Sequence, residues 1–393
     1  MKKNVLIASF DLEVGGVERS LISMLRNYDY DQYEVDLKLF SHTGDFMDLL
    51  PPGPGLLTEC PKYKTFRLSI AETVKRGSFA LAAARLRARY KAARSGAEET
   101  GYRQMQYMWQ YALPHLPEAR KPYDIAISYL WPHDFVAYKV TAKTKIAWIH
   151  TDYSTVDTDV ERDLKTWSAF DAIIAVSDQC RKAFLKKYPI LKKKVHVVEN
   201  ITSPDMVRTL ASEEEPEPLN RDHRFKFVTV GRLSHAKGID QAVEALKLLV
   251  DKGYSDAAWY VVGYGGDEAA IREAVASYGL EDHFFLLGKK TNPYPYMKAA
   301  DVYVQPSRYE GKAVTVGEAQ ILGKPVLITN YPTARSQVKD GVDGLICSQG
   351  PKGIADGLEV MLTNERLRQK LSANCLETDY RNHDELLKLY TLP

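Results

Sequence analysis

The sequence predicts an α/β protein with two domains, each built on a doubly wound parallel sheet. The chain has 393 residues, and at about 150 residues per domain this length favours two or three domains. Short β-rich runs alternate with helical periodicity along most of the chain, which is typical of parallel strands joined by crossover helices. The alternation stops after residue 202 and resumes near residue 225, so we place a domain boundary there.

The first predicted domain covers residues 1–202. Its first strand is followed by the periodic segment from Val17 to Leu25, which predicts a helix. Further β-rich runs follow, each bounded by turn residues. The predicted strands are residues 4–10, 33–40, 124–130, 145–150, 171–177 and 195–200.

Residues 203–224 are predicted to be a linker, because three prolines and a cluster of acidic residues interrupt both periodicities. The second predicted domain, residues 225–375, repeats the α/β alternation. Domains of this kind bind ligands at the carboxyl ends of their strands, so we expect the functional site in a cleft between the two domains. The predicted strands are residues 225–231, 257–263, 283–288, 301–306 and 324–329.

The composition excludes several classes of protein. Hydrophobic residues make up 45% and charged residues 26% of the chain, which fits a globular protein and not a disordered, collagen-like or coiled-coil chain. The 53 Lys and Arg nearly balance the 51 Asp and Glu, so no global positive field favours nucleic acid as a partner.

Cysteine spacing and the length of apolar runs indicate in which cellular compartment the protein is expected. The four cysteines form no Cys-x-x-Cys pair and no zinc-ligand spacing, so we expect a reduced, cytoplasmic protein without a disulfide framework. The amino terminus lacks a signal-peptide cleavage site. No run approaches the roughly 18 to 20 apolar residues that span a bilayer, so any membrane contact is expected at the surface.

The segment 62–103 is strongly basic, with eleven Lys and Arg against Glu72, Glu98 and Glu99. A helical wheel places an apolar face between cations, a pattern typical of a helix that lies on an anionic membrane. The alternative is a core-facing helix whose long cationic side chains reach out to water. The apolar face consists of Phe79, Ala82, Ala83, Leu86, Tyr90 and Ala93, and the flanking cations are Arg85, Arg87, Arg89, Lys91 and Arg94.

Two glycine-rich turns have different interpretations. Gly15 and Gly16 follow the first predicted strand, where backbone N–H groups and a helix amino terminus can approach an anion or a sugar. The alternative is an ordinary tight turn. The stretch 263–268, GYGGDE, lies too deep in the second domain to be a dinucleotide fingerprint, so a nicotinamide enzyme is disfavoured.

Two loops of the second domain carry candidate ligands for a sugar nucleotide. Arg232 and Lys237 lie between a predicted strand and a helix, where two cations can clamp a diphosphate. Glu310 precedes a glycine turn and Glu318 lies eight residues later, and carboxylates are good acceptors for vicinal hydroxyls. The turn's N–H groups near Ala313 to Val316 are expected to face phosphate. The alternatives are a solvated loop and two surface charges.

In combination and in this order, these motifs resemble those of retaining family-4 glycosyltransferases, also called glycosyltransferase group 1, which have the GT-B architecture of two facing Rossmann-like domains. The resemblance covers nearly the whole chain. It implies that Arg232 and Lys237 bind the diphosphate and that Glu318 binds the ribose. It also implies that residues 376–393 include a helix packing back onto the first domain.

The resemblance further assigns the donor sugar to Glu310, to Gly311 and to the backbone that follows, at Ala313, Val314 and Thr315. His150, at a predicted strand end, matches the family's histidine beside the transferred sugar; as an isolated residue, a strand-end histidine is more often structural. Lys312 and Ala313 depart from the family pattern, in which a large apolar residue and a proline or glycine often follow Glu-Gly.

The acceptor side and a metal site are less well marked. Trp131, His133 and Asp134 follow a predicted strand, and aromatic and polar residues there suit a sugar acceptor; buried packing of Trp131 is the alternative. Asp152 is a further acceptor-side candidate. The two Asp-x-Asp triplets, 29–31 and 157–159, end no plausible strand, so we interpret them as surface acids and predict metal-independent chemistry without a cofactor.

The predicted function is therefore transfer of a hexose from a nucleoside diphosphate sugar, with UDP favoured, to a sugar or lipid-linked glycan acceptor. The resemblance implies retention of anomeric configuration and a role in bacterial surface polysaccharide or glycolipid synthesis. The expected location is the cytoplasm, including the inner face of the membrane. Two alternatives stay open: a nucleotide-sugar epimerase or hydrolase on the same scaffold, and a non-catalytic sugar-nucleotide binding protein.

Overall fold

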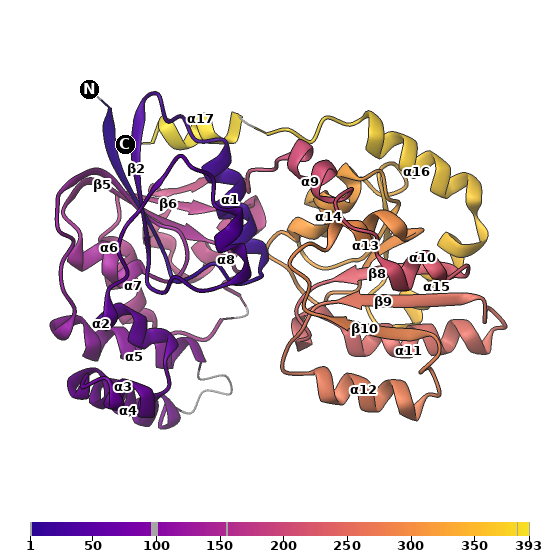
Figure 1. Ribbon diagram of the computed structural model, residues 1–393, viewed down its shortest axis with the longest axis horizontal. Coiled ribbons are helices and arrows are strands. Elements are labelled where there is room, and N and C mark those ends of the chain that lie inside the picture. Colours follow the sequence, from indigo (N-terminus) through magenta and orange to yellow (C-terminus); the bar gives the residue numbers. More distant parts are fainter. Residues whose placement is uncertain (1, 96–100, 155, 383, 393) are drawn as a thin grey trace. The chain divides into compact units, whose positions relative to one another are not determined.

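The computed structural model describes residues 2–95, 101–154, 156–382 and 384–392. The chain divides into two compact units (Figure 1). Unit 1 comprises Met1–Ile201 together with His383–Pro393, and unit 2 comprises Thr202–Asn382.

Unit 1 contains a sheet of seven parallel strands in the order β3-β2-β1-β4-β5-β6-β7. The central strand β1 pairs with β2 through Val5 and Val35 and with β4 through Val5 and Ile125. The order therefore reverses between β1 and β4, which is the topological switch point of a doubly wound sheet. The strands are β1 Lys3–Ser9, β2 Tyr33–Leu39, β3 Gly55–Leu56, β4 Tyr123–Ser128, β5 Ala142–Ile149, β6 Ala172–Ala175 and β7 Val195–Val197.

The helices of unit 1 fill the connections between these strands. Strands β1 and β6 are buried on both faces along most of their length, as expected for a parallel sheet covered by helices on either side. The helices are α1 Gly16–Arg26, α2 Pro61–Lys64, α3 Ile70–Lys75, α4 Phe79–Ala93, α5 Gly101–Ala112, α6 His133–Lys139, α7 Val160–Ser168, α8 Asp178–Lys187 and α17 Asp384–Tyr390.

Unit 2 contains six parallel strands in the order β10-β9-β8-β11-β12-β13, with its switch point between β8 and β11. One face of this sheet packs against α11, α12 and α15, and the other against α9, α13 and α14 (Figure 1). The strands are β8 Phe225–Val230, β9 Ala257–Val262, β10 Phe284–Gly288, β11 Val302–Gln305, β12 Val326–Thr329 and β13 Leu345–Cys347. The helices are α9 Pro204–Leu210, α10 Glu217–Arg221, α11 Ile239–Asp251, α12 Glu268–Ser277, α13 Tyr294–Ala299, α14 Val314–Ile321, α15 Pro351–Thr363 and α16 Glu365–Glu377.

The segment 203–224 differs from the predicted linker. It belongs to unit 2 and contains two short helices, α9 and α10. Pro204 is the first residue of α9 and Pro216 caps α10. Proline has no N–H to lose at a helix start, so these prolines begin helices instead of breaking them.

The carboxy-terminal helix α17 is part of unit 1. The ring of Tyr390 stacks on Tyr33 with 4.8 Å between centroids, and its hydroxyl accepts a hydrogen bond of 2.8 Å from the backbone N–H of Asp29. Leu386 and Leu389 are buried. The last residues of the chain therefore complete the core of the unit that the first residues begin.

The basic helix α4 is oriented differently from one of the two sequence interpretations. Its buried residues are Leu81 and four alanines, whereas Phe79, Leu86 and Tyr90 are exposed, so the large apolar side chains do not face the core. The helix therefore does pack on unit 1, but through Leu81 and the alanines and not through the apolar face that the helical wheel predicted. The prediction that Arg85 is one of the membrane-flanking cations is wrong. Its side chain extends from the inner side of the helix, and its guanidinium donates to the backbone carbonyls of Thr65 and Leu68.

No helix among the residues that the structure describes has the length and apolar character needed to cross a bilayer.

Candidate functional site

Two loops meet at the switch point of the unit 2 sheet. Strands β8 and β11 are neighbours, paired through Phe227 with Val302 and through Val228 with Tyr303. The loop after β8 contains Arg232 and the loop after β11 leads to α14. Because both strands are parallel, their carboxyl ends lie at the same edge, where doubly wound sheets bind ligands.

Close backbone packing holds these two loops together. Gly238 has φ of 64°, and a Cβ built there would lie 2.2 Å from the carbonyl oxygen of Pro306, so only glycine fits. The backbone N–H of Arg308 donates to the carbonyl of Ala236 at 2.8 Å. The loop after β9 approaches as closely, since a Cβ on Gly263 would lie 1.8 Å from the carbonyl oxygen of Gly231. Gly263 and Gly265 thus serve loop packing, since a Cβ on Gly265 would lie 2.1 Å from the carbonyl oxygen of Leu233.

Lys237 and Glu310 form an ion pair between the two loops. The Lys237 Nζ atom lies 2.7 Å from Oε1 and 2.8 Å from Oε2 of Glu310. The lysine side chain is 25% exposed and the glutamate side chain 8% exposed. A pair this little exposed is weakly screened by salt. The sequence-predicted diphosphate ligand and the predicted sugar ligand are therefore in direct contact.

The Glu310 carboxylate also accepts hydrogen bonds from buried polar residues that were not predicted from the sequence. Its Oε1 accepts from Ser307 Oγ at 2.6 Å and from Gln305 Nε2 at 3.0 Å. Gln305 Oε1 in turn accepts from the hydroxyls of Tyr303 and Thr315. The sequence offered one indication of this network: a glutamine and a serine stand at the end of an apolar predicted strand. Buried polar groups need hydrogen-bond partners, so a polar site could be expected there.

The cations of these loops differ in their surroundings. The side chain of Arg232 is exposed. Arg308, which the sequence reasoning also passed over, forms a bidentate pair with Asp240 and donates to the carbonyl of His235 at 2.7 Å. Arg308 therefore braces the loop, whereas Arg232 stands at its surface.

The second predicted carboxylate, Glu318, lies inside α14. It is 3% exposed, and its Oε1 accepts from the Tyr294 hydroxyl at 2.7 Å. Helix α14 begins after Ala313, whose N–H donates to Gln337 Oε1 at 3.1 Å and whose carbonyl accepts from Gln337 Nε2 at 2.9 Å. The N–H groups of Val314 and Thr315 open the helix and have no acceptor within it.

The predicted residues of unit 1 cluster at the switch point of its own sheet. Gly15 caps α1 after β1, and His150 follows β5. The Tyr129 ring lies 4.7 Å from the His150 ring, and its hydroxyl lies 2.8 Å from Ser20 Oγ on α1. Ser20 Oγ also donates to Asn200 Oδ1 at 2.9 Å. Tyr129 therefore links the helix that starts at Gly16 with the histidine.

His150 is a neutral histidine in this structure. Burial lowers its pKa to about 3. Both ring nitrogens are buried, and the backbone of Tyr129 acts as a hydrogen-bonding neighbour that opposes the lowering of the pKa.

Trp131 has an unusual backbone. Its φ of 62° is the one left-handed value at a non-glycine position within the described residues. Non-glycine residues in this region are strained and cluster at functional sites. Its ring lies 4.8 Å from the Tyr102 ring. Asp152 is buried, and its Oδ1 accepts from the backbone and hydroxyl of Ser154.

His133 and Asp134 begin α6 beside Trp131. Burial lowers the pKa of His133 to about 3, and its Nδ1 lies 2.7 Å from Ser128 Oγ. Burial raises the pKa of Asp134 to about 7, although Arg162 donates to its Oδ1 at 2.9 Å. Both side chains therefore point into unit 1.

The Asp-x-Asp triplets have structural roles. Asp29 accepts from the backbone of Asp31 and Gln32, Asp157 pairs with Arg103, and Asp159 caps α7. In the described part of the chain, His, Cys, Asp and Glu side chains form no group of three that could hold a metal ion. Metal independence stays a prediction.

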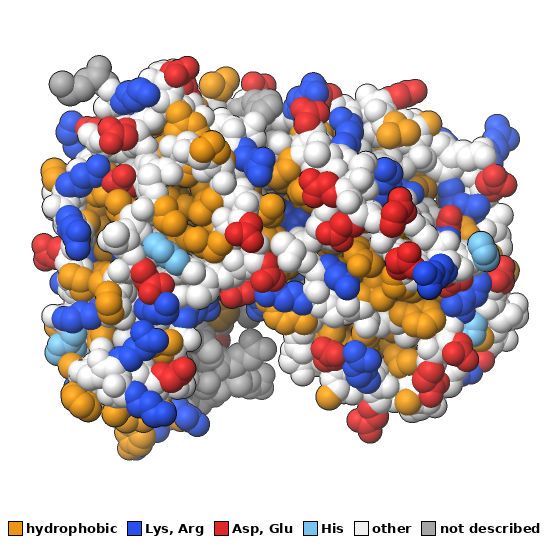
Figure 2. All heavy atoms as spheres, in the orientation of Figure 1, with side chains coloured by type: hydrophobic (Ala, Val, Ile, Leu, Met, Phe, Trp, Pro, Cys, Tyr) orange, Lys and Arg blue, Asp and Glu red, His pale blue; other side chains and the backbone are white. Residues whose placement is uncertain are grey.

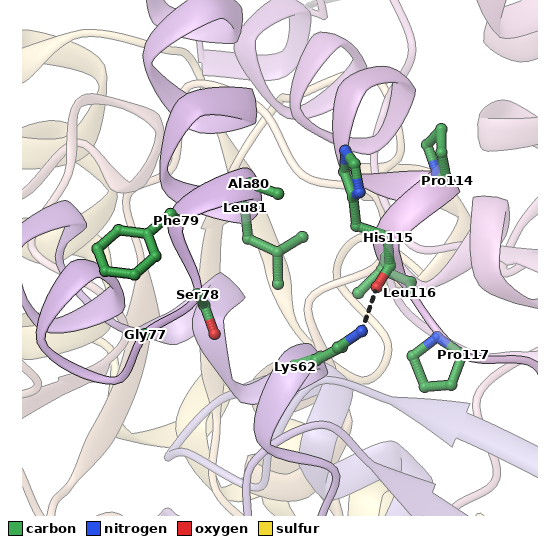
Figure 3. A pocket seen from close by; sticks show the side chains of 10 residues that line it. All are labelled: Lys62, Gly77, Ser78, Phe79, Ala80, Leu81, Pro114, His115, Leu116 and Pro117. Carbon is green, nitrogen blue, oxygen red and sulfur yellow. Dashed lines mark hydrogen bonds between the residues drawn. The ribbon is translucent and has the colours of Figure 1, made fainter.

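A cavity of about 460 Å³ opens at the start of α4 in unit 1. Figure 3 shows Lys62, whose Nζ donates to the carbonyl of His115 at 3.0 Å, on its floor between Ser78 and Leu116. None of the predicted donor-binding residues lines this cavity.

Two Rossmann-like units, each with a parallel doubly wound sheet, define the GT-B fold, and solved structures agree. HepE of Anabaena, in complex with UDP and glucose, matches with a TM-score of 0.68 at 16% identity, covering 95% of this chain and 94% of that one. The cleft expected between the domains stays a prediction.

Residues 211–377 match the family model of glycosyl transferases group 1. The match confirms the resemblance to group 1 for the motifs of unit 2, whereas family 4 and retention of configuration stay predictions. Two relatives are the capsular polysaccharide biosynthesis glycosyltransferase CapM of Staphylococcus aureus and the lipopolysaccharide core biosynthesis mannosyltransferase LpsB of Rhizobium meliloti. CapM is 30% identical over 164 residues, 41% of this chain and 43% of CapM. LpsB is 28% identical over 229 residues, 55% of this chain and 64% of LpsB. The chain thus spans less than two thirds of either relative.

Proposed function

We propose that the chain is a retaining glycosyltransferase that moves a hexose from a nucleoside diphosphate sugar to a sugar or lipid-linked glycan acceptor. The observation that carries the proposal is the contact between Lys237 and Glu310 at the switch point of unit 2. A cation for the diphosphate and a carboxylate for the sugar hydroxyls are there within 2.8 Å of each other.

In this proposal Arg232 and Lys237 bind the diphosphate. An ammonium group has three N–H donors, and Glu310 engages Lys237 through two oxygens, so the lysine is oriented before the ligand arrives. The opening N–H groups of α14 add positive partial charge. As the glycosidic bond breaks, negative charge grows on the diphosphate, and these groups stabilise it.

The environment of Glu310 favours a reaction without a covalent sugar intermediate. Its oxygens accept from an ammonium, a hydroxyl and an amide, and a carboxylate with such strong donors is a weak nucleophile. We therefore propose that the acceptor oxygen attacks the anomeric carbon on the face from which the diphosphate leaves. The acceptor's proton passes to a diphosphate oxygen, and configuration is retained.

The other predicted ligands take supporting roles. Glu318 is proposed to bind the ribose hydroxyls, with Tyr294 fixing its orientation at 2.7 Å. His150 is proposed to contact the transferred sugar. Because its pKa is about 3, it acts as a neutral hydrogen-bonding group and not as a cation at physiological pH.

UDP is the favoured donor nucleotide, since UDP is bound in the HepE complex. The acceptor class follows from CapM and LpsB, which serve capsular polysaccharide and lipopolysaccharide core biosynthesis. Among the alternatives, an epimerase or hydrolase needs an additional acid and base near the sugar. A non-catalytic binding protein needs neither Glu310 nor His150.

A thermal-shift screen with UDP-, GDP- and ADP-hexoses identifies the donor, because a ligand raises stability according to its affinity. Incubation of that donor with a glycan acceptor panel in EDTA, followed by NMR of the product, then tests the reaction. The proposal predicts a glycoside with the donor's anomeric configuration, formed without added metal. Donor consumption without an acceptor would indicate an epimerase or hydrolase. Donor binding without any turnover would indicate a non-catalytic sugar-nucleotide binding protein.

A further inference from the structure

The outer face of α4 exposes large apolar side chains. Phe79 is 67% exposed, Leu86 54% and Tyr90 64%, and they lie on one side of the helix at spacings of seven and four residues. Val74 on the preceding helix α3 adds a further 41% exposed side chain. These four exposed residues replace the six of the helical wheel as the apolar face, since Ala82 of that set is buried.

The inner face of α4 is the side that packs on the described part of unit 1. Leu81, Ala84, Ala88 and Ala92 are buried, and small alanine side chains allow α4 to pack closely on α5. Burial of a phenylalanine or leucine side chain is among the most favourable steps in folding. A helix that instead buries alanines and exposes its largest apolar residues presents a surface for another apolar phase.

The charges around the apolar face are positive. Lys75, Arg76, Arg87, Arg89 and Arg94 are exposed. Arg87 lies over the Tyr111 ring and Arg94 over the Tyr90 ring, so both stay beside the face. Within the described part of segment 62–103 the single acidic residue is Glu72, whose carboxylate accepts from the backbone N–H of Ser69 in a capping box.

We propose that α3 and α4 dock the protein on an anionic phospholipid bilayer. The apolar face enters the boundary between headgroups and acyl chains, and the flanking cations contact lipid phosphates. Figure 2 shows hydrophobic and basic side chains interspersed at the lower edge of unit 1, where Figure 1 draws these two helices. The inference concerns a surface that the proposed sugar transfer does not require.

The direction of Phe79 agrees with this orientation. Its ring points away from the other side chains that line the cavity at the start of α4, such as Leu81 and Lys62 (Figure 3). Phe79 therefore does not fill the cavity of its own unit and is available at the surface.

Co-sedimentation of the full chain with vesicles tests the proposal. One set contains phosphatidylcholine alone and the other equal parts of phosphatidylcholine and phosphatidylglycerol. The wild type is expected to bind the anionic vesicles and to be released by high salt. Each cation near an anionic leaflet changes partitioning about fivefold, so Arg89→Glu with Arg94→Glu should reduce it at least about 25-fold. Phe79→Ala with Leu86→Ala should reduce it at least about tenfold.

The matched control changes another exposed cluster of unit 1, with Ile190→Ala, Lys192→Glu and Lys193→Glu. Ile190 is 77% exposed. The control should bind like the wild type, and circular dichroism should show every variant folded. Equal binding to both vesicle types, no binding to either, or an equal loss in the control overturns the proposal. A lipid-free dimer that Phe79→Ala with Leu86→Ala dissociates also overturns it, because a second copy would then cover the face.

Discussion

Lys237 donates to both carboxylate oxygens of Glu310, at 2.7 and 2.8 Å, although 73 positions separate the two residues in the chain. The contact is possible because β8 and β11 lie side by side at the switch point of the sheet. In the proposed reaction, the same lysine also meets the leaving diphosphate. The carboxylate then orients the lysine and at the same time offsets part of its charge.

This arrangement predicts opposite effects of Glu310→Gln on binding and on turnover. Removing the negative charge leaves Lys237 more attractive to a diphosphate, so UDP affinity should rise about three- to tenfold. Turnover should fall at least about a hundredfold, because the sugar loses its charged acceptor. Calorimetric titration with UDP and initial rates with the UDP-sugar measure the two effects.

Glu281→Gln provides the control, because Glu281 is exposed and lies outside the two loops. It should change neither quantity. Weaker UDP binding in Glu310→Gln would show that the carboxylate does not offset the lysine charge.

Ser307→Ala should lower turnover about five- to tenfold and leave UDP affinity unchanged. Ser307 is fully buried and donates to Oε1 of Glu310 at 2.6 Å, and one lost hydrogen bond is worth about 1 kcal/mol. Ser307→Thr keeps the hydroxyl and should restore most of the rate. Steady-state kinetics separates kcat from KM, and a loss of UDP binding in Ser307→Ala would contradict a role that acts through Glu310.

Much of the architecture could be predicted, because burial of a strand or helix shows in the hydrophobic pattern of its own residues. Strands such as β1 are buried on both faces, so their apolar runs are continuous. The short strands β3 and β13 were missed, because their residues are exposed or only partly buried. The prolines at 204 and 216 were interpreted as breakers, since sequence alone does not show that each one starts a helix.

The candidate site was less accessible to sequence reasoning. The loops with Lys237 and Glu310 could be located, but their direct contact depends on the order of strands in the sheet. The roles of Gln305 and Ser307 depend on which atom each one touches. On α4, a helical wheel places Arg85 beside the apolar face, and only tertiary packing shows that its guanidinium turns inward.

The two buried histidines of unit 1 should each lower its stability as the pH falls below about 6.5, the ordinary pKa of histidine. Asp134, whose pKa burial raises to about 7, opposes this loss. Burial lowers the pKa of His133 and His150 to about 3. Between these values the unfolded chain binds protons that the folded unit does not. Stability is therefore fully present above about pH 6.5 and is lost as pH falls toward 3. Each histidine should cost about 2 kcal/mol at pH 5.

Denaturant unfolding at pH 7 and pH 5 measures this loss. His133→Asn keeps a polar atom near the position of Nδ1, which lies 2.7 Å from Ser128 Oγ. The variant should lose about 2 kcal/mol less than the wild type between the two pH values. An equal loss in both proteins would show that His133 is protonated in the folded unit.

The carboxy-terminal helix should contribute to the stability of unit 1. Leu389 is 3% exposed, so Leu389→Ala should lower the free energy of unfolding by about 2 to 4 kcal/mol. Leu387, in the same helix, is 58% exposed, and Leu387→Ala should change it by less than about 0.5 kcal/mol. Equal effects on the unfolding midpoint would indicate that α17 does not pack on unit 1 in solution.

Titration of UDP into the wild type and into a double variant, Arg232→Ala with Lys237→Ala, tests the central claim most directly. A second double variant on the same unit, Lys247→Ala with Lys252→Ala, is the control. Charge-assisted hydrogen bonds contribute about 1.5 to 3 kcal/mol each, so the first pair should weaken UDP binding at least about a hundredfold. The control pair should bind UDP as the wild type does. Unchanged UDP affinity after loss of Arg232 and Lys237 would contradict a diphosphate site between the loops that follow β8 and β11.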